Sequence, residues 1–184
     1  MELTYQQVRD ILPRAKKQDI IDFVGDFNKF SWLHKMTKVK EIAHFIAQIG
    51  HESLQLLYKT EIDSGAYLEG RLDLGNTEPG DGSRFKGRGW LMCTGRYNYA
   101  EFTKWYNKNF KDQEDFVKNP TRISDEHELS FIVSVWFWQN KKIRPVALAN
   151  NVKAVTKKVN GGTNGYAERK AYTKQALKVL SQVA

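Results

Sequence analysis

Two glutamates, nine residues apart, are the side chains of this chain best suited to acid and base chemistry. Glu52 lies in the stretch AHFIAQIGHES, on a helical face whose other members are Ile42, Phe45, Ile49 and Leu56. A carboxyl on an apolar face is harder to ionise, so it can hold the proton that a general acid must donate. Glu61 is the nearest acid that could act as the matching base.

Each glutamate also has a plain structural interpretation. A glutamate at the edge of an apolar stripe is more often paired with a lysine or arginine, and the pattern alone favours that role for Glu52. Glu61, with Asp63 close by, would by itself be a solvated surface acid. Pattern alone therefore leaves both roles open for each residue.

The spacing of the two glutamates sets a condition on the backbone between them. On one continuous helix, nine residues would place the carboxyls on opposite faces and about 13 Å apart along the axis. The two groups could then not act on one bond. If the helix ends near Tyr58 and the chain turns, both carboxyl groups can face one cleft. An inverting glycosidase needs a distance of about 6.5–9.5 Å between its two carboxyl groups, which admits a water molecule.

Neither a metal site nor a cofactor is expected. The His51-Glu52 pair matches the start of a zinc-binding helix, but Gln55 stands where that motif needs its second histidine. His44 and His51 are two helical turns apart, too far to chelate one metal without other ligands. Hydrogen-bonded or solvated roles are expected for both histidines.

A short glycine-rich segment, GRG at residues 87–89, lies among Arg84, Lys86 and Arg88. Its spacing fits neither a dinucleotide-binding turn nor a P-loop. As a basic patch for nucleic acid it is a weak signal, which stays open as an alternative.

Composition narrows the class of protein. The chain has 184 residues, a formal net charge of +8 and one cysteine, Cys93, which excludes an intramolecular disulfide. The charge indicates an anionic partner, either nucleic acid or an anionic cell-wall polymer. The first residues, MELTYQQVRDILPRAKKQD, lack the apolar run of a signal peptide, and no segment approaches membrane-spanning length.

Helical periodicity predicts a mainly α fold. We expect two short helices within residues 4–30, broken at Pro13, and a third from an N-cap at Thr37 to about Leu57. Residues 64–88 contain six glycines and predict a long loop region, a kind of segment that is usually functional in a compact domain.

The second half of the chain predicts four more helices. They are residues 97–110 with Tyr99, Phe102 and Tyr106 on one side, residues 125–139 buried and capped by Asp125 or Ser124, residues 153–159 ending at Asn160-Gly161-Gly162, and residues 166–183. No long strand is predicted, although short hairpins within residues 64–94 stay open.

Four separated motifs together resemble one known family. They are HES at residues 51–53, the second acid Glu61, PGDGSRFKGRGWLMCTGRYNY at residues 79–99 and VNGGTNGYAER at residues 159–169. This set, which spans about residues 40–182, resembles the family 19 glycoside hydrolases, which include plant chitinases and bacteriophage endolysins. The close spacing of the glutamates, the single cysteine and the GRG…TGR…NGG pattern are most similar to the phage-type endolysins.

The resemblance implies a single catalytic domain over residues 1–184, with the helices of residues 1–36 packed on it. The implied fold is mainly α and lysozyme-like, with two lobes, a cleft and the long glycine-rich loop region. The implied reaction is hydrolysis of β-1,4 links to N-acetylglucosamine or N-acetylmuramic acid, with inversion at the sugar.

The resemblance also assigns catalytic roles. Glu52 matches the proton donor, and Glu61 matches the base that activates water. Thr94 matches a serine or threonine that helps to hold that water, and a hydroxyl suits this task because it both donates and accepts hydrogen bonds. Without the resemblance, Thr94 would be an ordinary turn residue.

Further matches line the implied cleft. The residues expected to contact sugar are Tyr97, Asn98, Asn160, Arg169 and Met92. Asn160 could equally be part of a helix stop, and Arg169 could be a structural partner of either glutamate. Met92 departs from the family, because it replaces a glutamine thought to contact sugar and cannot donate a hydrogen bond.

The leading hypothesis is therefore a muramidase-type endolysin that cleaves peptidoglycan glycan strands. It is expected to act as a monomer, without nucleic acid or membrane insertion, and to be made in the cytoplasm and act on the cell wall after release or export. A chitinase is the alternative within the same chemistry. A catalytically silent protein that binds cell wall or nucleic acid is the alternative from another class.

Overall fold

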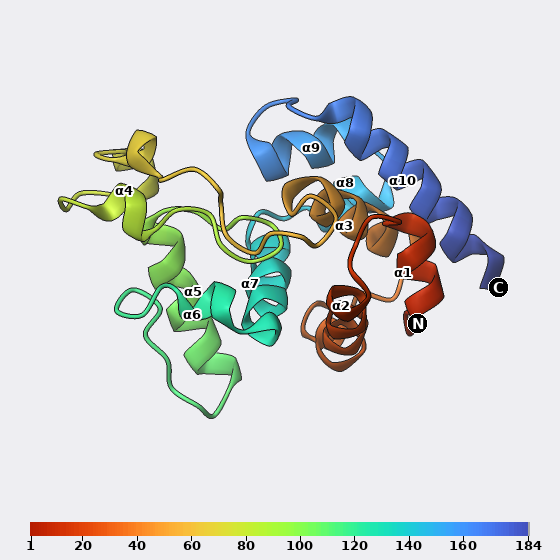
Figure 1. Cartoon of the computed structure of the whole chain (residues 1–184), viewed down its shortest axis with the longest axis horizontal. Helices are drawn as coiled ribbons and strands as arrows, with labels where there is room; N and C mark the ends of the chain where they lie inside the picture. The colour runs from red at the N-terminus through yellow and green to blue at the C-terminus, as the bar shows by residue number, and fades with distance from the viewer. Residues whose placement is uncertain (184) are drawn as a thin grey trace.

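The computed structural model describes residues 1–183, which are mainly helical as predicted (Figure 1). The α-helices are α1 (Tyr5–Ile11), α2 (Lys17–Phe30), α3 (Val39–Glu52), α4 (Asp81–Arg84), α5 (Arg96–Asn109), α6 (Arg122–Asp125), α7 (His127–Asn140), α8 (Arg144–Leu148), α9 (Val152–Asn160) and α10 (Tyr166–Leu180). Short 3-10 helices are η1 (Ser31–His34), η2 (Ala66–Leu68), η3 (Leu72–Leu74) and η4 (Ser181–Val183). Within the described residues, no helix is both long and apolar enough to span a membrane.

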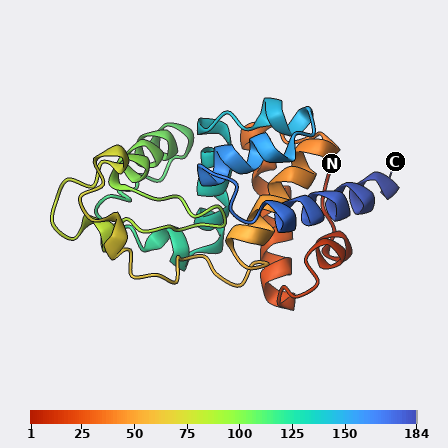
Figure 2. The same ribbon diagram turned by 90° about the horizontal axis from the view of Figure 1, so that it is seen from above.

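The elements fall into two groups that we call the small lobe, residues 60–125, and the large lobe, the rest of the described chain. Figure 2 shows the small lobe at one end of the molecule and α9 and α10 toward the other. Helices α5 and α6 of the small lobe both contact α7, which therefore joins the lobes.

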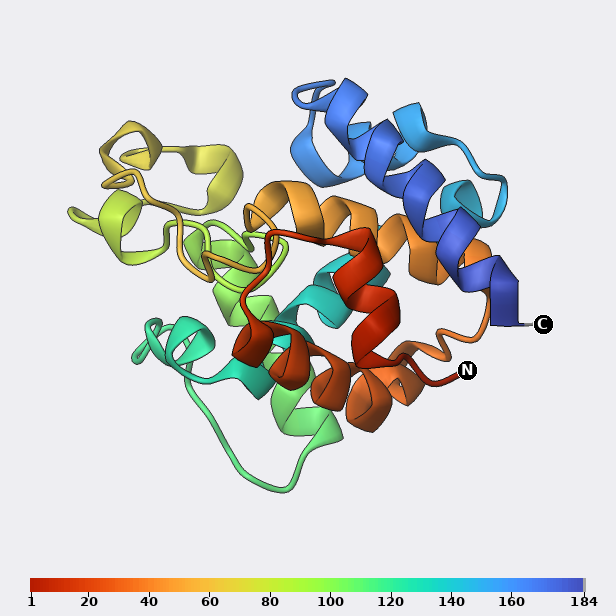
Figure 3. The same cartoon turned by 45° about the vertical axis from the view of Figure 1, so that its right-hand side comes forward.

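Helices α3 and α7 form the centre of the large lobe. α10 packs along α3, and α2 packs against α7 (Figure 3). Residues 129–138 of α7 are all buried, because neighbours cover the helix on every side. Phe45 of α3 packs edge-on against Phe131 and Trp138 of α7, with ring centroids 5.9 and 5.3 Å apart. The first two helices join this core, since α1 contacts α10 and α2.

The helix that carries Glu52 ends sooner than predicted. α3 stops at Glu52 itself rather than near Tyr58, and residues 54–56 adopt left-handed φ angles of 51°, 60° and 65°. The hydroxyl of Ser53 donates to the carbonyl of Ile49 at 2.6 Å, which closes the last turn. The chain therefore reverses direction directly after Glu52.

Buried hydrogen bonds hold this left-handed turn, a conformation that costs non-glycine residues about 1–2 kcal/mol each. Gln55 is buried, and its Nε2 donates to Tyr172 Oη at 2.8 Å. Its Oε1 accepts from the backbone N–H of Arg14, also at 2.8 Å. Gln55 thus ties the turn to the N-terminal segment and to α10.

Two predicted helix starts were wrong by one or two residues. α3 begins at Val39 with Lys38 as its N-cap, so Thr37 does not cap it. α7 begins at His127 with Glu126 as its N-cap, because Ser124 and Asp125 belong to the separate short helix α6. By contrast, α9 ends as predicted, with Gly161 at a left-handed φ of 80°.

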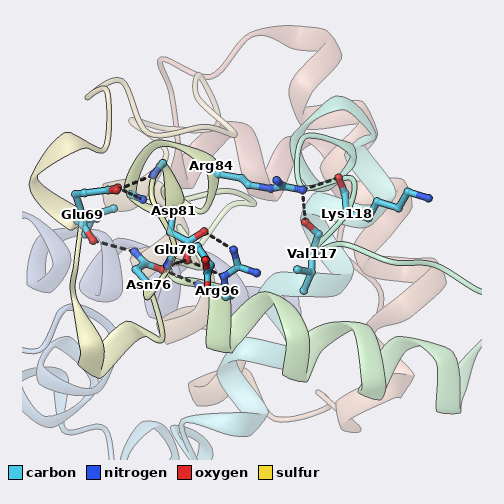
Figure 4. Close-up of polar contacts among 11 residues, drawn as sticks. Glu69, Asn76, Glu78, Asp81, Arg84, Arg96, Val117 and Lys118 are labelled. Carbon is cyan, nitrogen blue, oxygen red and sulfur yellow. Dashed lines mark hydrogen bonds and ion pairs between the residues drawn. The ribbon is translucent and has the colours of Figure 1, made fainter.

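The glycine-rich loop region contains only the short helical turns η2, η3 and α4, and a polar network holds it (Figure 4). Glu69 accepts hydrogen bonds from the backbone N–H groups of Gly80 and Gly82, at 2.6 and 2.8 Å. Asp81 pairs with Arg96 through two contacts of 2.7 and 2.5 Å. The buried Asn76 Oδ1 accepts from the backbone of Arg96 at 2.9 Å, so this network fixes the loop to the start of α5.

The basic residues around GRG donate hydrogen bonds within the fold. Arg84 donates to the carbonyls of Val117 and Lys118 (Figure 4), and Lys86 donates to the carbonyl of Asp63. Arg88 is buried and donates to carbonyls of its own loop and to a tyrosine hydroxyl. Isolated β-bridges pair residue 88 with residues 60 and 93, so this segment forms the only ladder-like pairing within residues 1–183.

Candidate active site

A cleft of about 590 Å³ brings together five of the predicted site residues. Its lining includes Glu52, Glu61, Met92, Thr94 and Asn160. Glu52 and Asn160 come from the C-terminal ends of α3 and α9 in the large lobe, whereas the other three come from loops of the small lobe. The turn after α3 therefore lets both glutamates face one space.

Glu52 is an ion-paired residue. Its Oε1 accepts from Arg169 Nη2 at 2.6 Å, and 17% of its side chain is exposed. Arg169 is fully buried and also donates to Gln48 Oε1 at 2.5 Å and to the carbonyl of Asn164 at 3.1 Å. The expectation of an acid held against an apolar surface was thus wrong, and the paired alternative describes the free protein.

The neighbouring His51 belongs to a separate hydrogen-bond pair. Its Nδ1 lies 2.5 Å from Glu168 Oε2. Burial raises the pKa of Glu168, but hydrogen bonds from His51 and Tyr172 outweigh it, and the pKa lies below its ordinary value. Gly165 is required here, since a Cβ on it would lie 2.0 Å from the His51 ring. No cluster of three or more metal-ligating side chains occurs among residues 1–183.

Glu61 is held by one backbone and one side-chain donor. The N–H of Gly87 donates to its Oε2 at 2.9 Å, and Tyr67 Oη donates to its Oε1 at 2.5 Å. Burial, followed by the bond to Glu61, raises the pKa of Tyr67 to about 12, so the phenol keeps its proton. Sequence reasoning missed Tyr67, because only the fold of η2 brings it back to Glu61.

Gly87 places the hydroxyl of Thr94 beside Glu61. A Cβ built on Gly87 would lie 3.3 Å from Thr94 Oγ1 and 3.4 Å from Glu61 Oε2, so both groups touch this glycine. Thr94 Oγ1 donates to the carbonyl of Met92 at 2.8 Å. The lone pairs of the hydroxyl and of the carboxylate are therefore available to the same small molecule in the cleft.

Known proteins are similar to this chain in sequence. No protein-family model matches it. A glycosyl hydrolase family 19 domain-containing protein of Haemophilus influenzae is 34% identical over 111 residues, covering 60% of this chain and 50% of the relative. An endochitinase of Arabidopsis thaliana is 31% identical over 141 residues, covering 76% of this chain and 46% of the relative. The chain belongs to glycosyl hydrolase family 19. It spans about half the length of these curated relatives.

Solved structures show the same fold as this family 19 chain. Chitinase C from Streptomyces griseus superposes with a TM-score of 0.73 at 17% identity, covering 97% of this chain and 92% of that one. A class IV chitinase from Zea mays superposes with a TM-score of 0.67 at 21% identity, covering 96% and 90%. The predicted lysozyme-like family 19 fold is thereby confirmed.

Three predicted sugar contacts of this family 19 chain, Tyr97, Asn98 and Arg169, lie outside the cleft lining. Tyr97 is 59% exposed and packs beside Gly75, where a Cβ would lie 2.9 Å from Tyr97 Cβ. Asn98 is buried, and its Nδ2 donates to the carbonyl of Thr94 at 2.6 Å. Asn98 therefore supports the Thr94 backbone, and Arg169 reaches the cleft only through Glu52.

Proposed function

We propose that this family 19 protein is a glycosidase that cleaves β-1,4 links of bacterial peptidoglycan with inversion at the sugar. One observation carries the proposal: Glu52 and Glu61 reach one cleft from opposite lobes, each held by its own partners. An acid and a base on two sides of one space is the arrangement that inverting hydrolysis uses.

Glu52 is the proton donor in this proposal. Arg169 occupies Oε1, whereas Oε2 accepts no hydrogen bond from the described residues, so Oε2 can carry a proton into the cleft. A bound sugar displaces water from the space around Oε2, so the leaving sugar becomes the partner of this oxygen. The proton then passes to the oxygen of the leaving sugar as the glycosidic bond breaks.

Glu61 is the base. Tyr67 and Gly87 each occupy one lone pair on a different oxygen of Glu61, which leaves a second lone pair on each to accept a proton from water. Thr94 Oγ1 donates its hydrogen to the carbonyl of Met92, so it orients that water by accepting a hydrogen bond from it. Attack from the side opposite the leaving sugar inverts the configuration.

The choice of polymer rests on charge. Peptidoglycan is anionic because its stem peptides carry free carboxylates, whereas chitin is neutral. The net charge of +8 therefore favours peptidoglycan. Chitin is the second candidate, because the relatives similar in sequence include plant proteins named endochitinases.

The test compares wild type with Glu52→Gln, which removes the proton but keeps an oxygen that can accept from Arg169. Each protein is incubated with isolated Gram-negative peptidoglycan and with soluble chitin oligomers. Mass spectrometry with reducing-end analysis identifies the products, and circular dichroism checks that the variant is folded. We expect soluble glycan from peptidoglycan with wild type only.

Three results would change the proposal. Cleavage of chitin oligomers alone would move the assignment to chitinase. Equal products from wild type and Glu52→Gln would remove Glu52 from the mechanism. No product from either polymer, with retained binding, would indicate a silent wall-binding protein in which Met92 marks a lost site.

A further inference from the structure

The positive charge of this protein is concentrated in one part of the chain. Residues 140–184 contain ten lysines and arginines and a single acid, Glu168. Residues 1–139 contain 19 basic and 20 acidic residues, so that part is almost neutral. The net charge of +8 therefore belongs to the segment from the end of α7 to α10.

Five lysines of this segment form a continuous group that we call the α9 lysine cluster. They are Lys141, Lys142, Lys153, Lys157 and Lys158, and all five are exposed. Lys158 Nζ donates to the carbonyl of Lys141 at 3.2 Å, which places the turn after α7 beside the end of α9. No acid occurs between Glu128 and Glu168, and no carboxylate of residues 1–183 forms an ion pair with the cluster.

Helix stability explains only part of this cluster. Lys157 and Lys158 lie in the last turn of α9, where positive charge suits the helix dipole. Lys153 lies in the first turn, where positive charge opposes the helix dipole. Lys153 and Lys157 are also like charges four residues apart, a spacing that destabilises a helix. The same spacing joins opposite charges in Arg122 and Glu126, whereas α10 repeats the like-charge spacing at Lys170, Lys174 and Lys178.

The cluster adjoins the cleft. Val159 and Asn160 follow Lys157 and Lys158 directly, and both line the cleft beside Glu52. A polymer that fills the cleft and leaves it along the large lobe therefore passes the end of α9. The remaining lysines of the segment lie on α10, which runs away from the small lobe toward the C-terminus (Figures 1 and 2).

We propose that the α9 lysine cluster binds the stem-peptide carboxylates of a peptidoglycan strand whose glycan lies in the cleft. This inference rests on the proposed function. Lysine suits the task because its ammonium is a mobile point charge that can follow carboxylates on flexible peptides. A neutral glycan such as chitin has no carboxylates for the cluster to bind, so the cluster favours binding of peptidoglycan over chitin.

Binding and cleavage are measured separately. For binding, Glu52→Gln protein is sedimented with intact sacculi and with sacculi whose carboxylates have been amidated. Two triple substitutions are added to the Glu52→Gln protein. The cluster triple is Lys153→Gln, Lys157→Gln and Lys158→Gln. The α10 control triple removes the same charge through Lys170→Gln, Lys174→Gln and Lys178→Gln. Cleavage of sacculi and of chitin oligomers is measured with the same triples in protein that retains Glu52.

We expect the cluster triple to weaken binding to intact sacculi roughly tenfold, as three exposed charge pairs of up to about 1 kcal/mol each allow. The α10 control should change binding less than about twofold. Amidated sacculi should bind all three proteins equally, and cleavage of chitin oligomers, where it occurs, should not change.

Equal weakening by both triples would overturn the proposal, because net charge alone would then explain it. Unchanged binding of the cluster triple to intact sacculi would also overturn the proposal. The proposed function and this inference fail on different results. If the protein binds sacculi through the cluster but releases no glycan, the proposed function fails and this inference stands. If the protein cleaves sacculi but its binding does not depend on the cluster, this inference fails and the proposed function stands.

Discussion

The contact between Arg169 and Glu52 predicts a large effect of Arg169→Met. Arg169 is fully buried and donates to Glu52 Oε1, Gln48 Oε1 and the carbonyl of Asn164, at 2.6, 2.5 and 3.1 Å. Methionine can fill much of the volume but donates nothing. The substitution therefore leaves a carboxylate, an amide and a backbone carbonyl without their common donor.

The size of the effect follows from the burial of each partner. Removing one member of a buried ion pair costs about 3–5 kcal/mol. Glu52 keeps 17% of its side chain exposed and can regain some water, so we expect the lower end, about 3 kcal/mol. For a chain of 184 residues, this corresponds to a decrease in Tm of about 6–12 °C.

Urea unfolding followed by circular dichroism measures this loss. Arg169→Lys is the matched control, because it keeps the charge but cannot reach three acceptors at once, and we expect about half the loss. Adding Glu52→Gln to Arg169→Met removes the stranded charge and should restore about 1 kcal/mol. A loss below about 1 kcal/mol for Arg169→Met, or no recovery in the double variant, would refute the argument.

Two further predictions concern the small lobe. Tyr67→Phe should lower kcat about tenfold, because Glu61 Oε1 loses the side-chain donor that holds the carboxylate in the cleft; stability should change little, since Tyr67 is 59% exposed. An unchanged kcat would contradict this. The hydrogen bond from Arg96 outweighs burial and holds the pKa of Asp81 below its ordinary value. The ionised Asp81 therefore stabilises the folded protein above about pH 4, and this contribution is lost as the pH falls through the pKa of Asp81 in the folded state. Asp81→Asn should therefore cost about 2 kcal/mol in urea unfolding at pH 7 and progressively less as the pH falls below about 4, and an equal loss at every pH would contradict the ionic origin.

The helices of the large lobe could be predicted from the sequence because burial leaves a periodic pattern. The apolar positions of α3 and the all-apolar stretch of α7 follow from their central place. The motif around Glu52 and Glu61 also identified the two acids that the cleft brings together. These features depend on residues near one another in sequence, which is why the sequence could reveal them.

The environment of each glutamate could not be predicted in the same way. The family resemblance offered Arg169 as a structural partner of either glutamate, and the structure pairs it with Glu52; however, the two residues are 117 apart, and the apolar stripe itself does not show which distant side chain covers Glu52. Tyr67 follows Glu61 by six residues, a spacing that matches no helix or strand contact, and only the irregular turn between them brings the two together. Irregular backbone carries no periodic signal, so the chemistry of the cleft depended on the structure.

The distance between acid and base depends on Ser53, the last residue of the HES motif. Ser53 is fully buried; its hydroxyl closes α3 by donating to Ile49 O, and the same Oγ accepts from the N–H of Leu56 at 2.8 Å. Its carbonyl accepts from the backbone of Leu57 and Tyr58, both at 2.9 Å. One residue thus ends the helix that holds the acid and directs the chain toward the base. The third position of HES is therefore required for geometry, even though its side chain does not reach the cleft.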